Sequence, residues 1–259
     1  MRGDILKKKL MVLCAVAIMI STCLTGCKMN SGKIRFGSAG IGGNHQIFGD
    51  TFANLISSKS KKYNIEVKTT AGSAANLRLL SKDYIQMAVA QMDLINDAYN
   101  RTGIFENDKK YQGYRAVASL YTEACQIVVP ADSDIQSMDD LEGKKVCIGE
   151  EESGTEQNAL QILNAYGLNE RLVDTVNLNY TDAAKKLKSG DIDAFFCTAG
   201  VQTTVINELS KQCKIRLVSL DQKGVSRLKK SYKFYTEYTI PAGTYVNQTK
   251  EIKTVGVKA

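Results

Sequence analysis

The 259-residue sequence predicts an α/β fold built from two similar lobes that are joined by a hinge. Strand-like and helix-like patterns alternate along the chain, the same alternation recurs about 110 residues later, and two extended segments cross between the halves. The first series consists of a strand at 34–37, a helix at 46–58, a strand at 65–70, a helix at 74–81 and a strand at 86–90. Such alternation is typical of a largely parallel sheet covered by helices.

The second series repeats the first in register. It consists of a strand at 145–149, a helix at 155–165, a strand at 176–180, a helix at 182–188 and a strand at 193–196. Equivalent points keep a nearly constant separation, which is 112 residues for Gly37 and Gly149, 111 for Ile65 and Val176, and 108 for Ser81 and Ser189. Extended segments at 115–130 and 252–259 are expected to connect the lobes. We therefore assign 33–125 and 250–259 to lobe I and 126–249 to lobe II, with a ligand cleft at the carboxyl ends of their strands.

The N-terminus has the pattern of an export signal. Lys7, Lys8 and Lys9 precede an apolar run at 10–20, which is too short to span a bilayer comfortably. The run is followed by Leu24-Thr-Gly-Cys27, which resembles a bacterial lipobox. We predict a lipoprotein signal peptide at 1–26, a lipid anchor on Cys27, a tether at 27–32 and a folded part outside the bacterial cell membrane. A plain signal peptide or an N-terminal anchor helix is the alternative.

Composition excludes several classes of function. Four basic residues and one acidic residue in the first 26 account for three of the seven excess positive charges, and no basic stripe with interleaved aromatics follows, so we expect no nucleic-acid partner. A single His and the lack of a Cys-x-x-Cys pair argue against a metal site, and no cofactor is expected. Four cysteines remain after the signal and the anchor: Cys125, Cys147, Cys197 and Cys213. Three disulfide pairings are open to them, but apolar neighbours favour buried thiols at Cys147 and Cys197.

Three glycine-containing loops precede predicted helices, at 37–46, 71–76 and 153–156. The first loop fits neither a dinucleotide fingerprint nor a phosphate loop, because His45 stands in place of the third glycine and Gly43-Asn44 in place of Lys and Ser/Thr. Small residues at a helix N-terminus let backbone N–H groups approach an anion. Simple tight turns, with Ser73 and Ser153 as N-caps, are the alternative. Three such loops at one cleft favour a carboxylate site.

Titratable residues give weaker signals. His45 has no identifiable partner for general-base chemistry, so we expect it to contact a ligand or lie on the surface. Asp93 and Glu123 lie beyond strand ends, where each carboxylate pairs either with a ligand ammonium or in a surface ion pair. The acidic run at 150–152 is expected to be a solvated loop.

Taken together and in order, short motifs make the chain from Lys33 to Ala259 resemble the TAXI family, the extracytoplasmic solute-binding proteins of TRAP transporters. The motifs are Gly40-Ile-Gly-Gly43, Gly72-Ser-Ala-Ala-Asn-Leu-Arg-Leu-Leu80, Gln91-Met-Asp93, Asp139-Asp-Leu-Glu-Gly-Lys-Lys-Val146, Ser153-Gly-Thr-Glu156, Phe196-Cys-Thr-Ala-Gly200, Phe234-Tyr235 and Ile240-Pro-Ala-Gly-Thr-Tyr245.

The resemblance implies a type II periplasmic-binding-protein fold that closes on a small carboxylate, such as glutamate or a related amino or dicarboxylic acid, and passes it to a sodium-coupled TRAP-type permease. The contacts implied for lobe I are Gly42, Gly43, Asn44, His45, Ser73, Asn76 and Gln91, and those for lobe II are Ser153, Gly154, Thr155, Thr198 and Gly200. Ile41 replaces the family's usual Thr, and His45-Gln46 occupies positions that are usually aromatic, so the ligand's identity stays open. The family also continues past the segment that ends here at Ala259, so we expect lobe I to be incomplete.

Two other functions are compatible with the sequence. A lipid-anchored sensor would present the same ligand-bound lobes to a membrane receptor. An extracytoplasmic hydrolase would use Ser or Cys with His45, but the sequence contains no Gly-x-Ser-x-Gly elbow and no orienting partner for the histidine is identifiable. We therefore expect a binding protein and not an enzyme.

Overall fold

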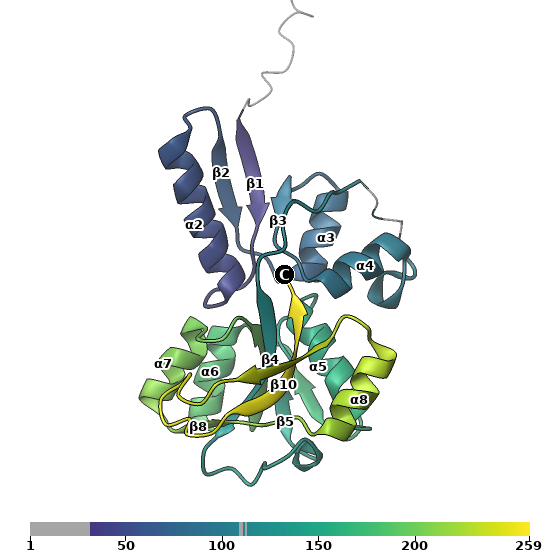
Figure 1. The fold of residues 1–259 in the computed structure, drawn as a ribbon, viewed down its shortest axis with the longest axis vertical. Coiled ribbons are helices and arrows are strands. Elements are labelled where there is room, and N and C mark those ends of the chain that lie inside the picture. The colour runs from purple at the N-terminus through teal and green to yellow at the C-terminus, as the bar shows by residue number, and fades with distance from the viewer. Residues whose placement is uncertain (1–31, 109–110, 112) are drawn as a thin grey trace, which may run out of the picture.

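Two lobes, one above the other, make up the computed structural model, which describes residues 32–108, 111 and 113–259 (Figure 1). The predicted signal peptide, Cys27 and nearly all of the tether lie outside the described residues. Within the described part, no helix has both the length and the apolar character that crossing a membrane requires.

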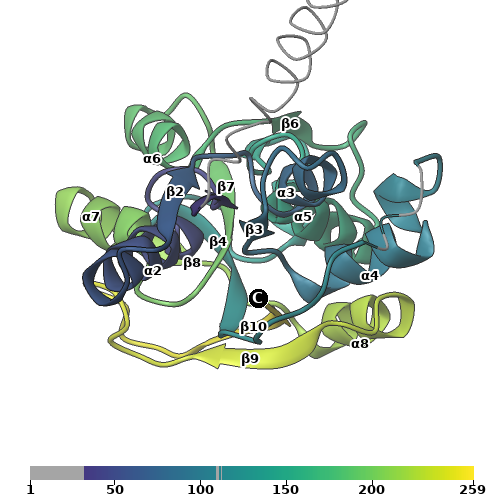
Figure 2. The ribbon, with the colours of Figure 1, turned by 90° about the horizontal axis from the view of Figure 1, so that it is seen from above.

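The smaller lobe contains a three-stranded parallel sheet of order β2-β1-β3. Its elements are β1 (Lys33–Gly37), α2 (Asn44–Lys59), β2 (Asn64–Lys68), α3 (Ser73–Ser81), β3 (Met87–Ala88), α4 (Met92–Asn100) and the short helix η1 (Gly103–Phe105). Seen from above, this sheet lies between α2 on one side and α3 with α4 on the other (Figure 2). Phe36 and Ile65 pack toward α2, whereas Leu77, Leu94 and Phe105 form the core under α3 and α4.

The larger lobe contains a mixed seven-stranded sheet of order β6-β5-β7-β4-β10-β9, with β8 paired to β4. Its elements are β4 (Thr122–Pro130), η2 (Asp139–Leu141), β5 (Lys145–Cys147), α5 (Gly154–Ala165), β6 (Asp174–Val176), α6 (Tyr180–Ser189), β7 (Ala194–Ala199), α7 (Thr204–Gln212), β8 (Ile215–Leu217), α8 (Gln222–Ser231), β9 (Thr236–Ile240) and β10 (Ile252–Lys258). Strand β7 is buried along its whole length because helices cover both faces of the sheet. This near-continuous apolar run is typical of a strand inside such a sheet.

The internal repeat found in the sequence corresponds to one strand order used twice. Strands β2-β1-β3 of the smaller lobe and β6-β5-β7 of the larger lobe both place the first strand of their series between the second and the third. The largest departure from the predicted strands is at β6, which ends at Val176, because Asn179 caps a helix that begins at Tyr180. The Oδ1 atom of Asn179 accepts a hydrogen bond from the backbone N–H of Asp182, which is a helix N-cap.

Strands β4 and β10 run antiparallel to each other where the chain crosses between the lobes (Figure 1). Both are members of the larger sheet, and Gly256 pairs with Ala124 and Val257 with Glu123. The pairing continues past the strand ends, since the N–H of Leu120 donates to the carbonyl of Ala259. These strands form the predicted hinge. The exact division into lobe I and lobe II remains a prediction.

The four cysteines of the described part carry free thiols. Cys147 in β5 and Cys197 in β7 are buried, as their apolar neighbours predict. Burial raises the pKa of the Cys125 thiol to about 12, so this thiol is protonated at neutral pH.

Candidate functional site

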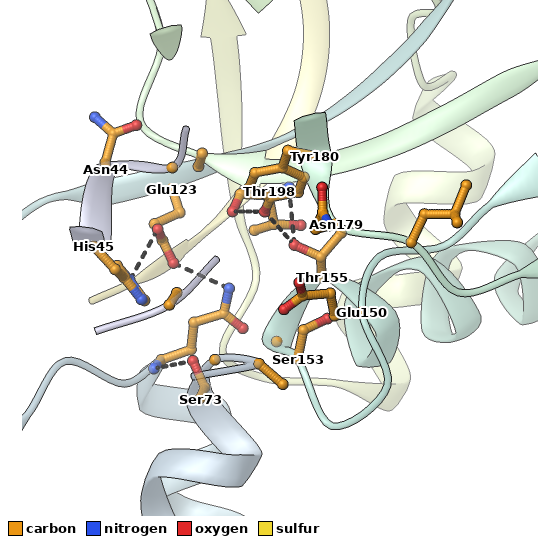
Figure 3. A pocket seen from close by; sticks show the side chains of 18 residues that line it. Asn44, His45, Ser73, Glu123, Glu150, Ser153, Thr155, Asn179, Tyr180 and Thr198 are labelled. Carbon is orange, nitrogen blue, oxygen red and sulfur yellow. Dashed lines mark hydrogen bonds and ion pairs between the residues drawn. The ribbon is translucent and has the colours of Figure 1, made fainter. Parts of the chain in front are cut away.

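A small cavity lies between the two lobes (Figure 3). Its volume is about 40 Å³, far below the ~300–1,000 Å³ of pockets that hold drug-sized molecules. The residues that line it are Ala39, Gly43, Asn44, His45, Ala71, Gly72, Ser73, Gln91, Glu123, Glu150, Ser153, Gly154, Thr155, Leu178, Asn179, Tyr180, Thr198 and Ala199. In this arrangement of the lobes, only a small ligand fits.

Four helices begin at the cavity, two from each lobe. Helices α2 and α3 start after Gly43 and Gly72 and have no side-chain N-cap. Helix α5 starts after Ser153, and α6 starts after Asn179. The first N–H groups of a helix have no partner inside it and carry partial positive charge, so the cavity is suited to a negatively charged group.

Gly72 and Gly154 permit the two lobes to approach at the cavity. Gly72 has φ 132° and ψ −146°, a conformation that is essentially confined to glycine, and a Cβ there would lie 3.4 Å from Cα of Ser153. A Cβ on Gly154 would lie 2.2 Å from Oε1 of Gln91. Both contacts join the smaller lobe to the larger one.

Glu123 is the centre of a buried polar cluster. It is the second residue of β4, its Oε1 lies 3.0 Å from Nε2 of His45, and its Oε2 accepts a hydrogen bond of 3.0 Å from Nε2 of Gln91. Glu123 is 2% exposed and His45 6%. Of the two alternatives for Glu123, the surface ion pair is therefore wrong. The residue belongs to the crossing strand β4, and its buried carboxylate lies against two polar side chains of the smaller lobe.

Hydroxyl groups of the larger lobe form the facing wall (Figure 3). Oγ1 of Thr155 hydrogen-bonds the hydroxyl of Tyr180 and accepts a hydrogen bond from the backbone N–H of Thr198, at 3.3 Å. The Tyr180 hydroxyl also reaches the carbonyl of Thr198, at 2.9 Å. Burial raises the pKa of Tyr180 well above its ordinary value, so this group remains a neutral hydroxyl.

Nine of the twelve residues that the sequence singled out line the cavity. They are Gly43, Asn44, His45, Ser73, Gln91, Ser153, Gly154, Thr155 and Thr198. Ser153 also caps α5, since its Oγ accepts a hydrogen bond from the N–H of Glu156. Ser73 is not an N-cap, and its Oγ instead accepts from the N–H of Gln91, at 3.1 Å.

The other three singled-out residues are not among the lining residues. Asn76 is fully buried, and its Nδ2 donates to the carbonyls of Ser38 and Val89, so it ties together loops that follow β1 and β3. Gly42 and Gly200 lie where the lobes touch beside the cavity. The carbonyl of Gly42 accepts from Oγ1 of Thr203, and a Cβ on Gly200 would lie 2.8 Å from the Asn44 amide.

Several lining residues were missed or misread. Asn179 and Tyr180 fell within an expected strand, although an Asn before a helical run is an N-cap signal. Glu150 was expected in a solvated loop, but it is half-buried and lines the cavity. Alanines and Leu178 carry no sequence signal that separates them from core residues.

Other contacts hold the lobes together outside the cavity. Oδ2 of Asp93 in α4 accepts a 3.1 Å hydrogen bond from Nδ2 of Asn158 in α5. Nε of Arg78 lies 2.9 Å from Oε1 of Glu152, whose carbonyl accepts from the N–H of Ala75. Asp93 is 6% exposed, so its expected surface ion pair is also wrong. The lobes are therefore in contact along a broad edge.

The surroundings of His45 bear on the alternative of a hydrolase. Glu123 now supplies His45 with a carboxylate partner, but within the described residues no Ser hydroxyl or Cys thiol hydrogen-bonds the imidazole. Those residues also contain no group of three His, Cys, Asp or Glu that would hold a metal ion.

Solved structures share the architecture. The chain is similar to an ancestral arginine-binding protein bound to arginine, with 18% identity, a TM-score of 0.50 and coverage of 77% of this chain and 92% of that one. It is also similar to a putative L-cystine ABC transporter from Listeria monocytogenes, with 15% identity, a TM-score of 0.50 and coverage of 87% of this chain and 82% of that one. The periplasmic aliphatic sulphonate binding protein SsuA from Escherichia coli matches at 17% identity and a TM-score of 0.46, over 72% of this chain but only 56% of SsuA. The fold is thus the two-lobed type II fold of periplasmic binding proteins. A family model matches residues 36–259, and the chain belongs to the NMT1-like family.

Proposed function

We propose that this protein is an extracytoplasmic solute-binding protein that captures a small carboxylate between its lobes, without turnover, and delivers it to a membrane permease. The ligand class is glutamate or a related amino or dicarboxylic acid, and the permease is of the TRAP type, as in TAXI proteins. The observation that carries the proposal is the convergence of four helix N-termini, two from each lobe, on one cavity.

A ligand that touches both lobes stabilises the closed arrangement over the open one. Carboxylate oxygens accept hydrogen bonds from backbone N–H groups, which are strengthened by the negative charge of the acceptor. The hydroxyl of Ser73, which accepts a hydrogen bond from the N–H of Gln91, adds a donor at the same cavity. Amino-acid ligands also agree with two structures of similar fold, which are named for arginine and cystine.

A thermal-shift panel of amino acids, dicarboxylates and 2-oxoacids tests the binding step. At a ligand concentration of 100 times Kd, stabilisation is ~2.7 kcal/mol, which corresponds to roughly 5–10 °C for a chain of this size. The double variant Ser153→Ala with Thr155→Ala should abolish the shift. Ser226→Ala with Thr239→Ala is the matched control, because both residues are exposed on the larger lobe. A folded protein that responds to no panel member would refute the proposal.

His45 separates a binding protein from a hydrolase. His45→Ala should change the affinity for the ligand. Neither the wild type nor this variant should hydrolyse it, because the proposed role involves no covalent step. Loss of a measurable hydrolysis in this variant would favour the enzyme.

A lipid anchor on Cys27 would keep the protein at the membrane, beside the proposed permease. The supporting feature is Leu24-Thr-Gly-Cys27 after a basic and apolar signal. Metabolic labelling with palmitate should mark the wild type, and Cys27→Ser should lose both the label and the membrane-bound fraction. A polytopic permease encoded beside the gene supports transport, whereas a histidine kinase there supports the sensor.

A further inference from the structure

The side chains that line the cavity carry an excess of negative charge. Two carboxylates, Glu123 and Glu150, and one imidazole, His45, are the ionisable acidic and basic groups among the lining residues, and neither Lys nor Arg is among them. A second carboxylate on the ligand, or a sulfonate without an amine, would add negative charge to a cavity that already has two lining carboxylates and neither Lys nor Arg. The partial positive charges at the helix N-termini can stabilise one acid group of the ligand, but they are too small to compensate a second one as well.

The two carboxylates differ in what surrounds them. Glu123 is compensated by His45 and Gln91. Glu150 forms no ion pair with any described residue, and burial together with the nearby Asp182 raises its pKa. A Cβ on Gly40 would lie 3.3 Å from both Glu150 oxygens, so this carboxylate faces the glycine loop of the opposite lobe. It is a negative group at the lobe interface that lacks a cation.

Two amide oxygens at the cavity also lack donors. Oε1 of Gln91, Oδ1 of Asn44 and Nε2 of His45 are buried atoms of lining residues without a hydrogen-bond partner among the described residues. The Asn44 side chain points away from Glu123 and Glu150 (Figure 3), whereas Gln91 is 2% exposed and held in place by its bond to Glu123. Buried acceptors are normally paired, so the unpartnered Oε1 of Gln91 indicates that the ligand supplies an N–H donor.

We propose that the ligand carries a protonated amino group in addition to its acid group, and that Glu150 and the unpartnered Oε1 atom of Gln91 bind this amino group. The ligand is then an amino acid or an amino sulfonic acid, and not a plain dicarboxylate, 2-oxoacid or alkanesulfonate. The inference rests on the proposed function, because it adds a second pole to a site already proposed to bind an acid.

Matched ligand pairs that differ only in one amino group test the inference by calorimetry. The pairs are L-glutamate and glutarate, L-glutamine and glutaramate, L-alanine and propionate, and taurine and ethanesulfonate. In any pair that binds, the amino member should bind roughly 10- to 150-fold more tightly, the range expected for losing one hydrogen-bonded charge. Equal or tighter binding of the desamino member would overturn the inference while leaving the proposed function intact.

Glu150→Gln adds a test of the residue. It should weaken binding of the amino member at least tenfold and leave the desamino member unchanged or tighter, with the wild-type unfolding midpoint. Glu151→Gln is the control, because this neighbouring carboxylate is exposed and outside the cavity. Equal effects of Glu150→Gln on both members would overturn the assignment. If no member of either series binds to the folded protein, the proposed function itself fails.

Discussion

Asp93 should make this protein less stable as the pH rises from about 4 to about 7. The residue lies in the first turn of α4, is almost completely buried, and accepts a hydrogen bond from Asn158 of the opposite lobe. Asn158 in turn donates to the Tyr235 hydroxyl, at 2.8 Å, so the side chain that hydrogen-bonds the carboxylate is a neutral amide, and no ion pair joins Asp93 to another described residue. Burial raises the pKa of Asp93 from 3.8 to about 6.

The sign and size follow from proton linkage. A carboxyl group with a pKa of about 6 in the folded state and 3.8 when unfolded binds more protons in the folded state between these values, so stability falls as pH rises through this range. A shift of about two pKa units corresponds to ~3 kcal/mol. Most of this, ~2–3 kcal/mol, is lost between pH 4 and pH 8.

Asp93→Asn removes the titration and keeps an oxygen that accepts from Asn158. In urea unfolding, the free energy of the variant relative to the wild type should therefore rise by ~2–3 kcal/mol between pH 4 and pH 8. Any pH-independent cost of the substitution cancels in this difference. Asp132→Asn, at an exposed site, is the control. A variant whose pH dependence is parallel to that of the wild type would refute the reasoning.

Three further substitutions test the packing. Gly154→Ala places a Cβ 2.2 Å from Oε1 of Gln91, so it should hold the lobes apart and increase the radius of gyration in small-angle scattering, and adding Gln91→Ala should reverse this; an unchanged radius would contradict it. Ser153→Ala removes the cap on the N–H of Glu156 and should lower the free energy of unfolding, measured with urea, by about 1 kcal/mol; an unchanged free energy would contradict this role of the cap. Phe105→Ala empties a fully buried site and should cost about 3–5 kcal/mol; a loss below about 1 kcal/mol would mean that the core collapses around it.

The architecture of the repeat could be predicted from the sequence because it depends on local patterns. Each strand of the two series is a short segment whose apolar residues are either continuous or alternating, and three of the four helices follow a loop with Gly or Ser. The type and order of these elements could therefore be predicted without tertiary information. Helices α4, α7 and α8 and strands β8 and β9 were not predicted. Strand β8 has three residues and β9 only one buried position, so neither carries a clear alternation.

The candidate site was predictable where backbone geometry leaves a sequence signal. Loops before helices contain seven of the singled-out lining residues, since helix N-termini attract Gly and Ser, whereas Gln91 and Thr198 came from the family resemblance. Glu123 and Glu150 gave no such signal, because whether a carboxylate is buried depends on segments far away in sequence. His45 and Gln91, which contact Glu123 here, precede it by 78 and 32 residues in the sequence.

The position of Glu123 links the site to the hinge. The carboxylate belongs to β4, which pairs with β10 at the crossing, yet its two polar partners come from the smaller lobe. Contacts outside the cavity, from Arg78 to Glu152 and from Asp93 to Asn158, act on the same equilibrium between open and closed lobes. Because the apparent Kd equals the intrinsic Kd divided by the fraction of competent molecules, the proposed binding mode predicts that these contacts change affinity without touching the ligand.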